Sequence, residues 1–227
     1  MRPIIRGPGP TRNPSHYDEY KDDLTDRLGY YCSYCEMQLT RAATHVEHIL
    51  PKEIHPHLER DWDNLLLACT HCNSIKGKSD VDLNEYLWPD RDNTFRALNY
   101  SEGGVITPAM HGEIERKAQN TIARFGLDKV PGHPKFSKKD DRWKKRKDIW
   151  DCAIRAKNNL SSNDTPEHRE TIIELAQARG FWSIWMTVFN DDPDMLQRLL
   201  NAFPGTCKSC FDASNAYIPV ARYGGQC

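Results

Sequence analysis

The chain has 227 residues, of which 38% are hydrophobic, so it is long enough for one or two packed cores but is polar for its size. Its 31 lysine and arginine residues are balanced by 32 aspartate and glutamate residues, which excludes an overall positive field that would attract nucleic acid. No segment approaches the roughly 20 apolar residues that span a bilayer, and the first ten residues lack the apolar stretch of a signal peptide. We therefore expect a cytoplasmic protein, in which the eight cysteines favour metal binding over disulfides.

The N-terminal part is predicted to contain an arm followed by a helix. Residues 1–14 include four prolines, two glycines and three arginines, a composition typical of a flexible, extended segment. A helix should begin near Ser15, with apolar side chains at helical spacing on one face and Gly29 as its stop.

The sequence pattern changes between Cys32 and about Ser79. Paired cysteines and clustered histidines appear here, together with two short runs typical of strands, at residues 44–49 and 64–68. We expect the helix that begins near Ser15 and this segment to form one module, residues 15–80, which contains the residues for catalysis and metal binding.

Residues 81–227 are predicted to form a helical domain for partner or nucleic-acid contacts. Helical spacing and end signals predict four helices, at residues 108–126, about 139–160, 166–180 and 192–200. On the second of these, Trp143, Trp150 and Ile154 are expected to be buried. The aromatic run at residues 181–189 is interpreted as core filling rather than as a platform on which bases stack.

Two Cys-x-x-Cys pairs stand out, Cys32 with Cys35 and Cys69 with Cys72, separated by 33 residues. Two such pairs can complete a closed tetrahedral shell of thiolates around one zinc ion. A closed shell leaves no position for water, so we expect the ion to be structural and to supply folding free energy that so small a core lacks. The alternative is four reduced cysteines that are merely near one another.

Four residues between and just after these pairs have side chains suited to catalysis or metal binding: Glu47, His48, Asn64 and Asn73. The pKa of a neutral imidazole lies close enough to neutral pH for His48 to take a proton from an attacking water. Oxygen atoms of Glu47 and Asn73 suit a hard divalent ion, which stabilises charge on phosphate oxygens. Taken singly, each residue is commonly a surface or turn residue, so the hypothesis depends on their order within the cysteine frame.

This order, interleaved with the cysteine pairs over residues 31–80, resembles the zinc-knuckle subset of the HNH (ββα-metal) endonuclease family. The resemblance implies a ββα unit in which His48 is the general base and Asn64 holds the loop that orients it. Glu47 and Asn73 would hold the catalytic ion, although many members of the family have Asp or His in place of Glu47. An Asn at the last position favours magnesium or manganese over zinc or nickel.

The expected fold class is therefore α+β and mostly helical. A small ββα-metal HNH unit with a four-cysteine zinc site would be embedded in a helical body. Nucleic-acid contacts are predicted for the basic segment 135–148, which holds eight lysine or arginine residues against three aspartates, and in particular for Lys144, Lys145 and Arg146. The alternative for this segment is a solvated helix face with local ion pairs.

The layout of the whole chain resembles, with less specificity, the PtuB family of nuclease subunits in Septu and retron anti-phage systems. The features that carry this resemblance are the MRPI start, the proline-rich arm, the early HNH unit, the helical second half, and the runs at residues 203–206 and 210–212. It implies an ABC-type ATPase partner of the PtuA type, possibly acting with a retron, and a nuclease effector role in antiviral defence.

Two other functions remain open at this point. One is a free-standing HNH nuclease of the restriction or homing type, and the other is a catalytically inactive zinc-braced module that binds nucleic acid or protein. A binding module would need only the cysteines, and a free-standing nuclease would be expected to carry a DNA-reading domain, which we do not find. The residues do not distinguish DNA from RNA as substrate. A late pair, Cys207 and Cys210, is an alternative metal pair if Cys227 or Cys152 joins it.

Overall fold

The computed structural model describes residues 1–227, which form eight α-helices and three antiparallel strand pairs. The helices are α1 Lys21–Leu28, α2 Thr70–Lys76, α3 Thr94–Ala97, α4 Glu113–Phe125, α5 Arg142–Ser162, α6 Pro166–Arg179, α7 Trp182–Val188 and α8 Pro193–Ala202. The strand pairs are β1 His45–His48 with β2 Leu65–Ala68, β3 Leu98–Ser101 with β4 Val105–Pro108, and β5 Phe211–Asp212 with β6 Ile218–Pro219.

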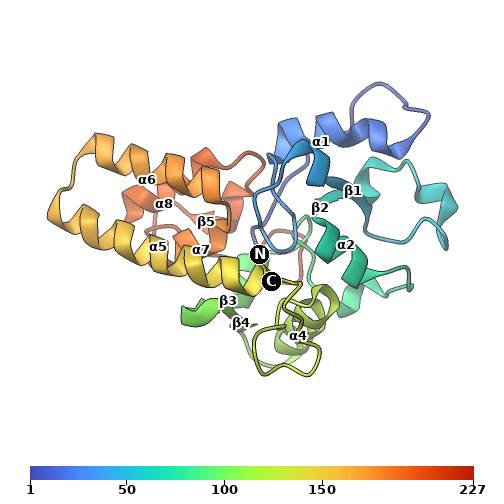
Figure 1. Cartoon of the computed structure of the whole chain (residues 1–227). Coiled ribbons are helices and arrows are strands. Elements are labelled where there is room, and N and C mark those ends of the chain that lie inside the picture. The colour runs from blue at the N-terminus through green and yellow to red at the C-terminus, as the bar shows by residue number, and fades with distance from the viewer.

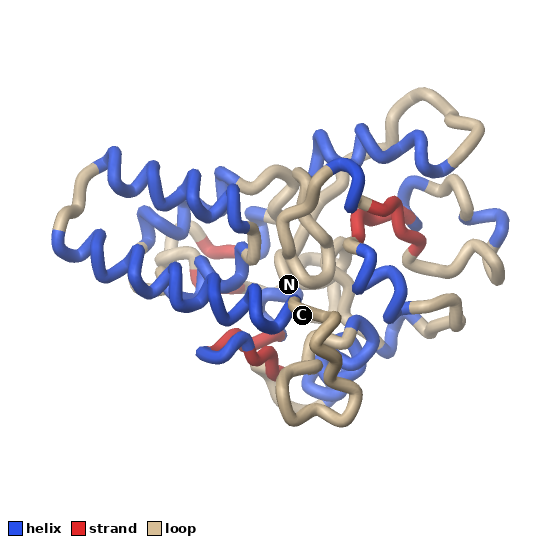
Figure 2. The backbone as a smooth tube through the Cα atoms, in the orientation of Figure 1, coloured by secondary structure: helices blue, strands red, loops and turns tan.

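The elements fall into two groups around one shared core. Helices α5 to α8 lie on one side of the molecule, and α1, β1, β2 and α2 lie on the other, with α4 and the β3–β4 hairpin below them (Figure 1). Figure 2 shows the three strand pairs as small, separate patches in a chain that is mostly helix and loop. The fold is thus α+β and mostly helical, as predicted. None of the helices combines the length and the apolar character that a membrane crossing requires.

The first helical segment begins as a 3₁₀ turn, Tyr17–Tyr20, and continues as α1. The turn is fixed at its start because the Glu19 carboxylate accepts hydrogen bonds from the Ser15 hydroxyl and the backbone N–H of His16. Gly29, with φ of 74°, ends α1 where the sequence predicted a stop.

The first residues are packed into the core, which differs from the free arm expected from their composition. Met1 and Ile4 are buried, and Ile4 forms a β-bridge with Thr206. The Arg2 guanidinium donates to the Leu28 carbonyl and to the Thr206 hydroxyl. Long-range contacts therefore fix this segment, although its prolines prevent it from forming a regular element.

The predicted helices of the C-terminal half are present, with differences at their ends. Helix α4 begins at Glu113 rather than near Pro108, because Pro108 belongs to strand β4. Thr165 caps α6 ahead of a proline at the first helical position, and Gly180 follows its end. Asp192 caps α8 in the same manner. Trp182, Trp185 and Phe189 are buried, so this run fills the core as predicted.

Helix α5 buries a different stripe from the one predicted. Trp143 and Trp150 are only half-buried and Ile154 is exposed, whereas Arg142 and Arg146 are 1% and 2% exposed. Both guanidinium groups donate to backbone carbonyls that end neighbouring segments. Such partners lie far away in the sequence, so helical spacing alone treats these arginines as surface residues.

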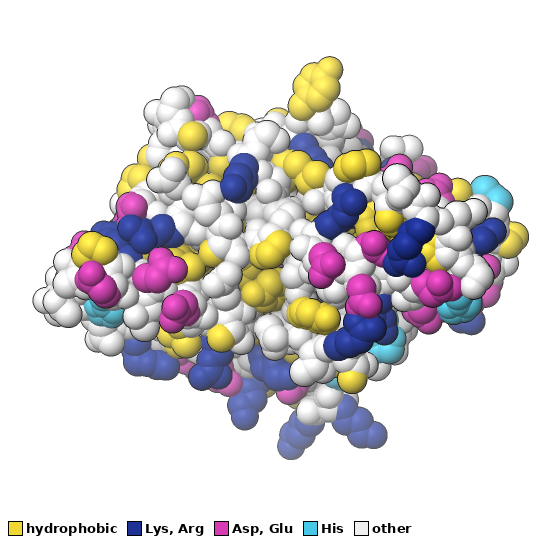
Figure 3. All heavy atoms as spheres, turned by 90° about the horizontal axis from the view of Figure 1, so that it is seen from above, with side chains coloured by type: hydrophobic (Ala, Val, Ile, Leu, Met, Phe, Trp, Pro, Cys, Tyr) yellow, Lys and Arg dark blue, Asp and Glu magenta, His cyan; other side chains and the backbone are white.

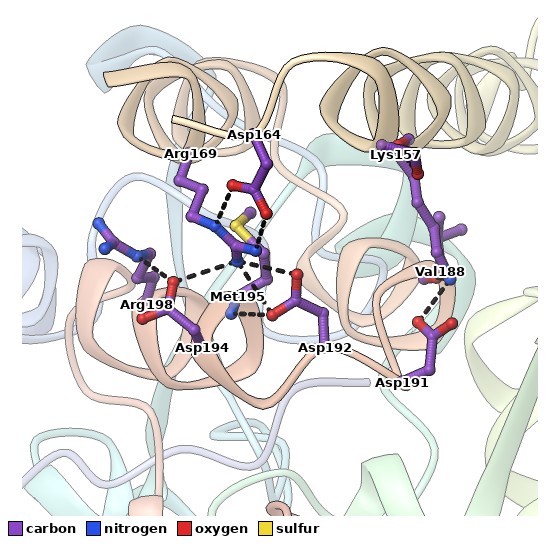
Figure 4. Close-up of polar contacts among 10 residues, drawn as sticks. Lys157, Asp164, Arg169, Val188, Asp191, Asp192, Asp194, Met195 and Arg198 are labelled. Atoms are coloured by element: carbon purple, nitrogen blue, oxygen red, sulfur yellow. Dashed lines mark hydrogen bonds and ion pairs between the residues drawn. The ribbon is translucent and has the colours of Figure 1, made fainter. Parts of the chain in front are cut away.

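The four helices α5 to α8 are joined at one end by a charged cluster (Figure 4). Arg169 on α6 donates to Asp164 in the preceding loop and to Asp192 and Asp194 at the start of α8. Asp194 also accepts a hydrogen bond from Arg198. The charged side chains that line the adjacent hollow of about 290 Å³ are paired with one another, so the cluster holds helices together and offers no free reactive group.

Gly180 lies where the helical half meets the loop of the first cysteine pair. It forms a β-bridge with Met37 and has φ of 72°, and an added Cβ would meet the Gln38 nitrogen and the Glu36 oxygen at 2.7 Å. These are backbone atoms that cannot move aside. We predict that Gly180→Ala lowers the free energy of unfolding by about 3 kcal/mol or more, measured by denaturant unfolding.

Gly112 provides a matched control for this substitution. Its φ of 71° is nearly the same as that of Gly180, but a Cβ there would meet nothing within 4 Å. Gly112→Ala should therefore show only the backbone penalty, about 1 kcal/mol. Equal losses in the two variants would contradict the importance of the close approach at Gly180.

Candidate active site and metal centre

Four sulfur atoms meet at one buried point, contributed by Cys32, Cys35, Cys69 and Cys72. All four lie within 4.8 Å of one another, and the Cys35 and Cys69 sulfurs are 3.7 Å apart. In a tetrahedral zinc site, bonds of about 2.3 Å place the sulfurs about 3.8 Å apart. The cluster therefore has the size and the ligands to hold one metal ion with every position filled by protein.

The local structure explains why the sulfurs converge. Cys69 is the N-cap residue of α2, and its sulfur accepts a hydrogen bond from the backbone N–H of Cys72. The first pair lies in the loop after α1, where the backbone N–H of Ser33 donates to the Leu67 carbonyl on β2. The loop, strand β2 and helix α2 are thus joined around the cluster.

A buried arginine from outside this segment contacts the cluster. Arg142 at the start of α5 donates from Nη1 to the Cys72 sulfur at 3.0 Å, and it forms an ion pair with Asp140 at 2.6 Å. A buried guanidinium beside sulfur stabilises the thiolate form that a metal site requires. No local pattern in the sequence indicates this contact, because Arg142 lies 70 residues beyond Cys72.

Strands β1 and β2 and helix α2 form a ββα unit, in which the two predicted strands are confirmed. Glu47 pairs with Leu66 across the hairpin, at the end of β1 next to His48. The unit borders a cleft of about 210 Å³ whose lining includes Glu47, His48 and Asn73. The structure therefore brings three of the four candidate residues to one cleft.

The His48 imidazole is held by one of its two nitrogens. Its Nε2 lies 2.9 Å from the Glu59 carbonyl oxygen, and because a carbonyl can only accept, Nε2 carries the proton. The Nδ1 atom of His48 has no hydrogen-bond partner within the protein. The side chain is largely buried, and burial lowers its pKa below the usual value, which favours the neutral ring. His48 is thus a neutral imidazole with an available lone pair.

Asn64, the fourth candidate, lies behind the cleft and ties together the loop between β1 and β2. Its side-chain oxygen accepts from the Leu50 backbone N–H at 2.8 Å, and its amide nitrogen donates to the Leu50 and Leu58 carbonyls. Asn64 is buried, and its backbone carbonyl accepts from Ile49. The residue therefore fixes the loop that includes Glu59, the partner of His48.

The Glu47 carboxylate is buried and engaged at both oxygens. Oε1 pairs with the Lys76 ammonium at 2.6 Å, and Oε2 accepts from the Tyr34 hydroxyl at 2.5 Å. Burial raises the pKa of Glu47, and Lys76 and Tyr34 oppose that shift. A carboxylate accepts in about four directions, so two contacts leave capacity for a metal ion. The half-buried Asn73 side chain has no hydrogen-bond partner, so both residues could offer an oxygen atom to a hard divalent ion in the cleft that they line.

Sequence reasoning missed three residues that shape this cleft. Lys76, which also donates to the His48 carbonyl at 2.5 Å, follows Asn73 by three positions and shares its helix face, so helical spacing could have identified it. Tyr34 lies inside the first cysteine pair, but nothing in that spacing indicates a contact with Glu47. Tyr17 comes from the N-terminal turn, and no sequence signal places it here.

The predicted nucleic-acid residues are not equivalent. Lys144 and Lys145 are exposed on α5, and Lys145 pairs with Asp141. Arg146 is buried, four residues after Arg142 on the same helix face, so its prediction as a nucleic-acid contact is wrong. Figure 3 shows lysine and arginine side chains interspersed with aspartate and glutamate on the face in view, without a large patch of one sign.

The late cysteine pair does not form a second metal cluster. The Cys207 and Cys210 sulfurs are 3.2 Å apart, but the Cys227 thiol contacts the Asn93 carbonyl instead, and Cys152 lies on α5. The four-cysteine cluster is the one place where three or more histidine, cysteine or acidic ligands converge.

Comparison with known proteins agrees with this geometry. Residues 32–79 match the sequence model of the HNH endonuclease family. A curated protein named Septu protein PtuB, from Bacillus thuringiensis, is 38% identical to this chain over 74 residues, which cover 30% of this chain and 29% of that protein. The alignment thus spans less than a third of the relative's length. The family match includes both cysteine pairs and all four candidate residues, which confirms the resemblance inferred from their order.

We predict one tightly held zinc ion per chain, bound by the four-cysteine cluster. Cys69→Ser should release the ion and lower the thermal unfolding temperature, because Cys69 both completes the shell and caps α2. Elemental analysis and thermal unfolding measure the two effects. Cys152→Ser is the matched control, since Cys152 is half-buried and lies outside the cluster. A parent protein free of metal, or a Cys69→Ser variant as stable as the parent, would contradict the metal centre.

Proposed function

We propose that this chain, which carries the HNH endonuclease segment at residues 32–79, is a metal-dependent endonuclease that hydrolyses phosphodiester bonds in nucleic acid. The observation that carries the proposal is the state of His48. Its Nε2 is held by a carbonyl while its Nδ1 is unpaired, in a cleft shared with Glu47 and Asn73. A neutral imidazole in this arrangement suits the role of general base.

In this mechanism His48 accepts the proton of the attacking water at Nδ1. The positive charge that develops on the ring is delocalised to Nε2, which donates to the Glu59 carbonyl more strongly as the charge grows. Asn64 keeps that carbonyl in place through its contacts with Leu58 and Leu50. Asn64 is therefore a positioning residue, and His48 is the reacting one.

Glu47 and Asn73 would hold a magnesium or manganese ion through their oxygen atoms. When bound, a hard divalent ion stabilises the negative charge that develops on phosphate oxygens. Lys76 already neutralises Glu47 and Asn73 is uncharged, so these three side chains together carry no net charge. We infer that substrate phosphate contributes to binding of the ion, and that affinity for the ion without nucleic acid is low.

The four-cysteine cluster is proposed to hold zinc in a structural role. Soft thiolate ligands favour zinc over magnesium, and a shell closed by four sulfurs has no position for substrate. The two metal sites are thus distinct in ligands and in function.

The available Nδ1 of His48 and the unpaired side chain of Asn73 favour an enzyme over an inactive binding module. A module that only binds would have no physical need for a buried carboxylate, a neutral imidazole and a free amide along one cleft. The exposed Lys144 and Lys145 remain candidates for contacts with nucleic acid outside this cleft.

The biological role proposed is that of a nuclease effector in an anti-phage defence complex with an ABC-type ATPase subunit. It is supported by the identity with Septu protein PtuB, in a segment that covers 29% of that protein, and by the layout of the remaining chain. The net charge of −1 also favours an assembly in which a partner contributes to the grip on nucleic acid.

We predict that His48→Ala lowers the cleavage rate by about two to four orders of magnitude while zinc content and fold are unchanged. Glu47→Ala and Asn73→Ala should instead weaken the catalytic ion, so that higher magnesium or manganese restores part of their activity. Single-turnover cleavage of DNA and RNA across a metal titration measures this contrast.

His45→Ala is the matched control for the His48 variant, because His45 lies on the same strand but its ring contacts Thr70 outside the cleft. It should cleave at the parental rate. A His48→Ala protein that cleaves as fast as the parent on both substrates would overturn the proposed function.

A further prediction concerns the assembly. Co-expressed with an ABC-type ATPase subunit of the PtuA type, the chain should co-elute with that subunit in size-exclusion chromatography, because its own net charge of −1 provides little affinity for nucleic acid without a partner. The complex should bind nucleic acid more tightly than the isolated chain at the same salt concentration. A chain that elutes alone and cleaves at full rate without a partner would contradict the assembly and leave the nuclease assignment intact.

A further inference from the structure

Four residues, one of which is His48, form a closed ring of contacts. The Glu59 carbonyl oxygen lies 2.9 Å from His48 Nε2, and the Glu59 carboxylate lies 2.8 Å from the Lys52 ammonium. That ammonium is 4.2 Å from the centre of the Tyr17 ring. The Tyr17 ring completes the circle, because it lies 4.6 Å from the His48 ring at an interplanar angle of 63°.

Tyr17 differs from the other members because it lies outside the segment that matches the HNH family. It belongs to the 3₁₀ turn before α1, whereas His48, Lys52 and Glu59 fall within residues 32–79. The capping contacts of Glu19 fix this turn, so Tyr17 lies at the cleft on an ordered element. The chain thus adds a residue of its own to the wall of the cleft.

The orientation of His48 needs more than its single hydrogen bond. The contact between Nε2 and the carbonyl fixes one edge of the ring but still permits the ring to pivot about that bond. A T-shaped aromatic contact from Tyr17 restricts this pivot from a second side, and the Lys52 ammonium over the tyrosine face restricts Tyr17 in turn. Together these contacts hold the imidazole in one orientation within the cleft that Glu47 and Asn73 also line.

From this geometry we propose that Tyr17 is a positioning residue for the general base His48. The inference rests on the proposed nuclease function and adds to it a residue outside the HNH segment. Tyr17 acts through its ring, because its hydroxyl has no hydrogen-bond partner in the protein. It affects the rate of proton transfer by restricting the imidazole and does not itself exchange a proton.

The test compares Tyr17→Phe with Tyr17→Leu in the full chain. The phenylalanine variant keeps the aromatic contact and should cleave within about twofold of the parental rate. The leucine variant removes it and should lower kcat by about 10- to 100-fold, the size of effect expected when a reacting group is misplaced. KM for the nucleic acid should be unchanged, because Tyr17 acts on the base and not on substrate affinity.

A double substitution separates positioning from other roles. If Tyr17 acts only through His48, then Tyr17→Leu combined with His48→Ala should cleave no more slowly than His48→Ala alone. Tyr30→Leu is the matched control, since Tyr30 is also a half-buried tyrosine, two residues after the end of α1, but does not line the cleft. Zinc content and circular dichroism establish that each variant is folded. If Tyr17→Leu is unfolded, Tyr17→Met provides a second non-aromatic side chain, which is unbranched and can adapt to the space left by the ring.

The outcomes distinguish this inference from the proposed function. A Tyr17→Leu variant with parental kcat, an equal loss in the phenylalanine variant, a loss confined to KM, or an additive double variant would each overturn the positioning role. Any of these results leaves the nuclease assignment in place as long as His48→Ala is impaired. Failure of the proposed function would be seen separately, as parental activity in His48→Ala.

Discussion

The convergence of four buried cysteine sulfurs at one point constrains the rest of the structure. Each cysteine pair belongs to a segment that also carries a side chain lining the cleft or contacting Glu47 in it. The cluster therefore fixes the position of these side chains as well as of the sulfurs. Tyr34, inside the first cysteine pair, donates to one oxygen of Glu47. Asn73 directly follows Cys72, and the helix that carries it begins at the capping sulfur of Cys69. Geometry in the cleft therefore depends on a four-cysteine cluster whose sulfurs do not line the cleft.

The same constraint extends to the helical half. Arg142 on α5 contacts the cluster, and the Glu36 carboxylate, next to Cys35, accepts from the backbone N–H and the hydroxyl of Ser183 at the start of α7. The backbone carbonyl of Glu36 accepts from Phe181. These contacts are buried and polar, and a buried polar group that loses its partner costs about 1–3 kcal/mol. The cysteine loop and the helices should consequently unfold in a coupled manner.

Features set by local spacing could be predicted from the sequence, and features set by distant contacts could not. The cysteine pairs, the two strands, the helix caps and the order of Glu47, His48 and Asn73 all depend on residues close in the chain or on fixed intervals. Arg146 was misplaced because its buried partners are backbone carbonyls of other segments. Tyr17 was missed for the same reason, since its neighbour His48 lies 31 positions away, an interval that follows no helical or strand period.

Charge in the cleft links the site to the composition of the whole chain. Three lysines line the cleft, and each is paired with a glutamate: Lys76 with Glu47, Lys52 with Glu59, and Lys78 with Glu53. The cleft is therefore nearly neutral on its own, as is the whole chain with its net charge of −1. The pairs of Lys52 and Lys78 are exposed enough to be weak, so an approaching phosphate can replace their glutamates at small cost. Such a cleft binds a polyanion only when other contacts already hold it nearby. Under the proposed function, selectivity would come from whatever brings nucleic acid to this cleft, because the chain's own field does little to attract a polyanion.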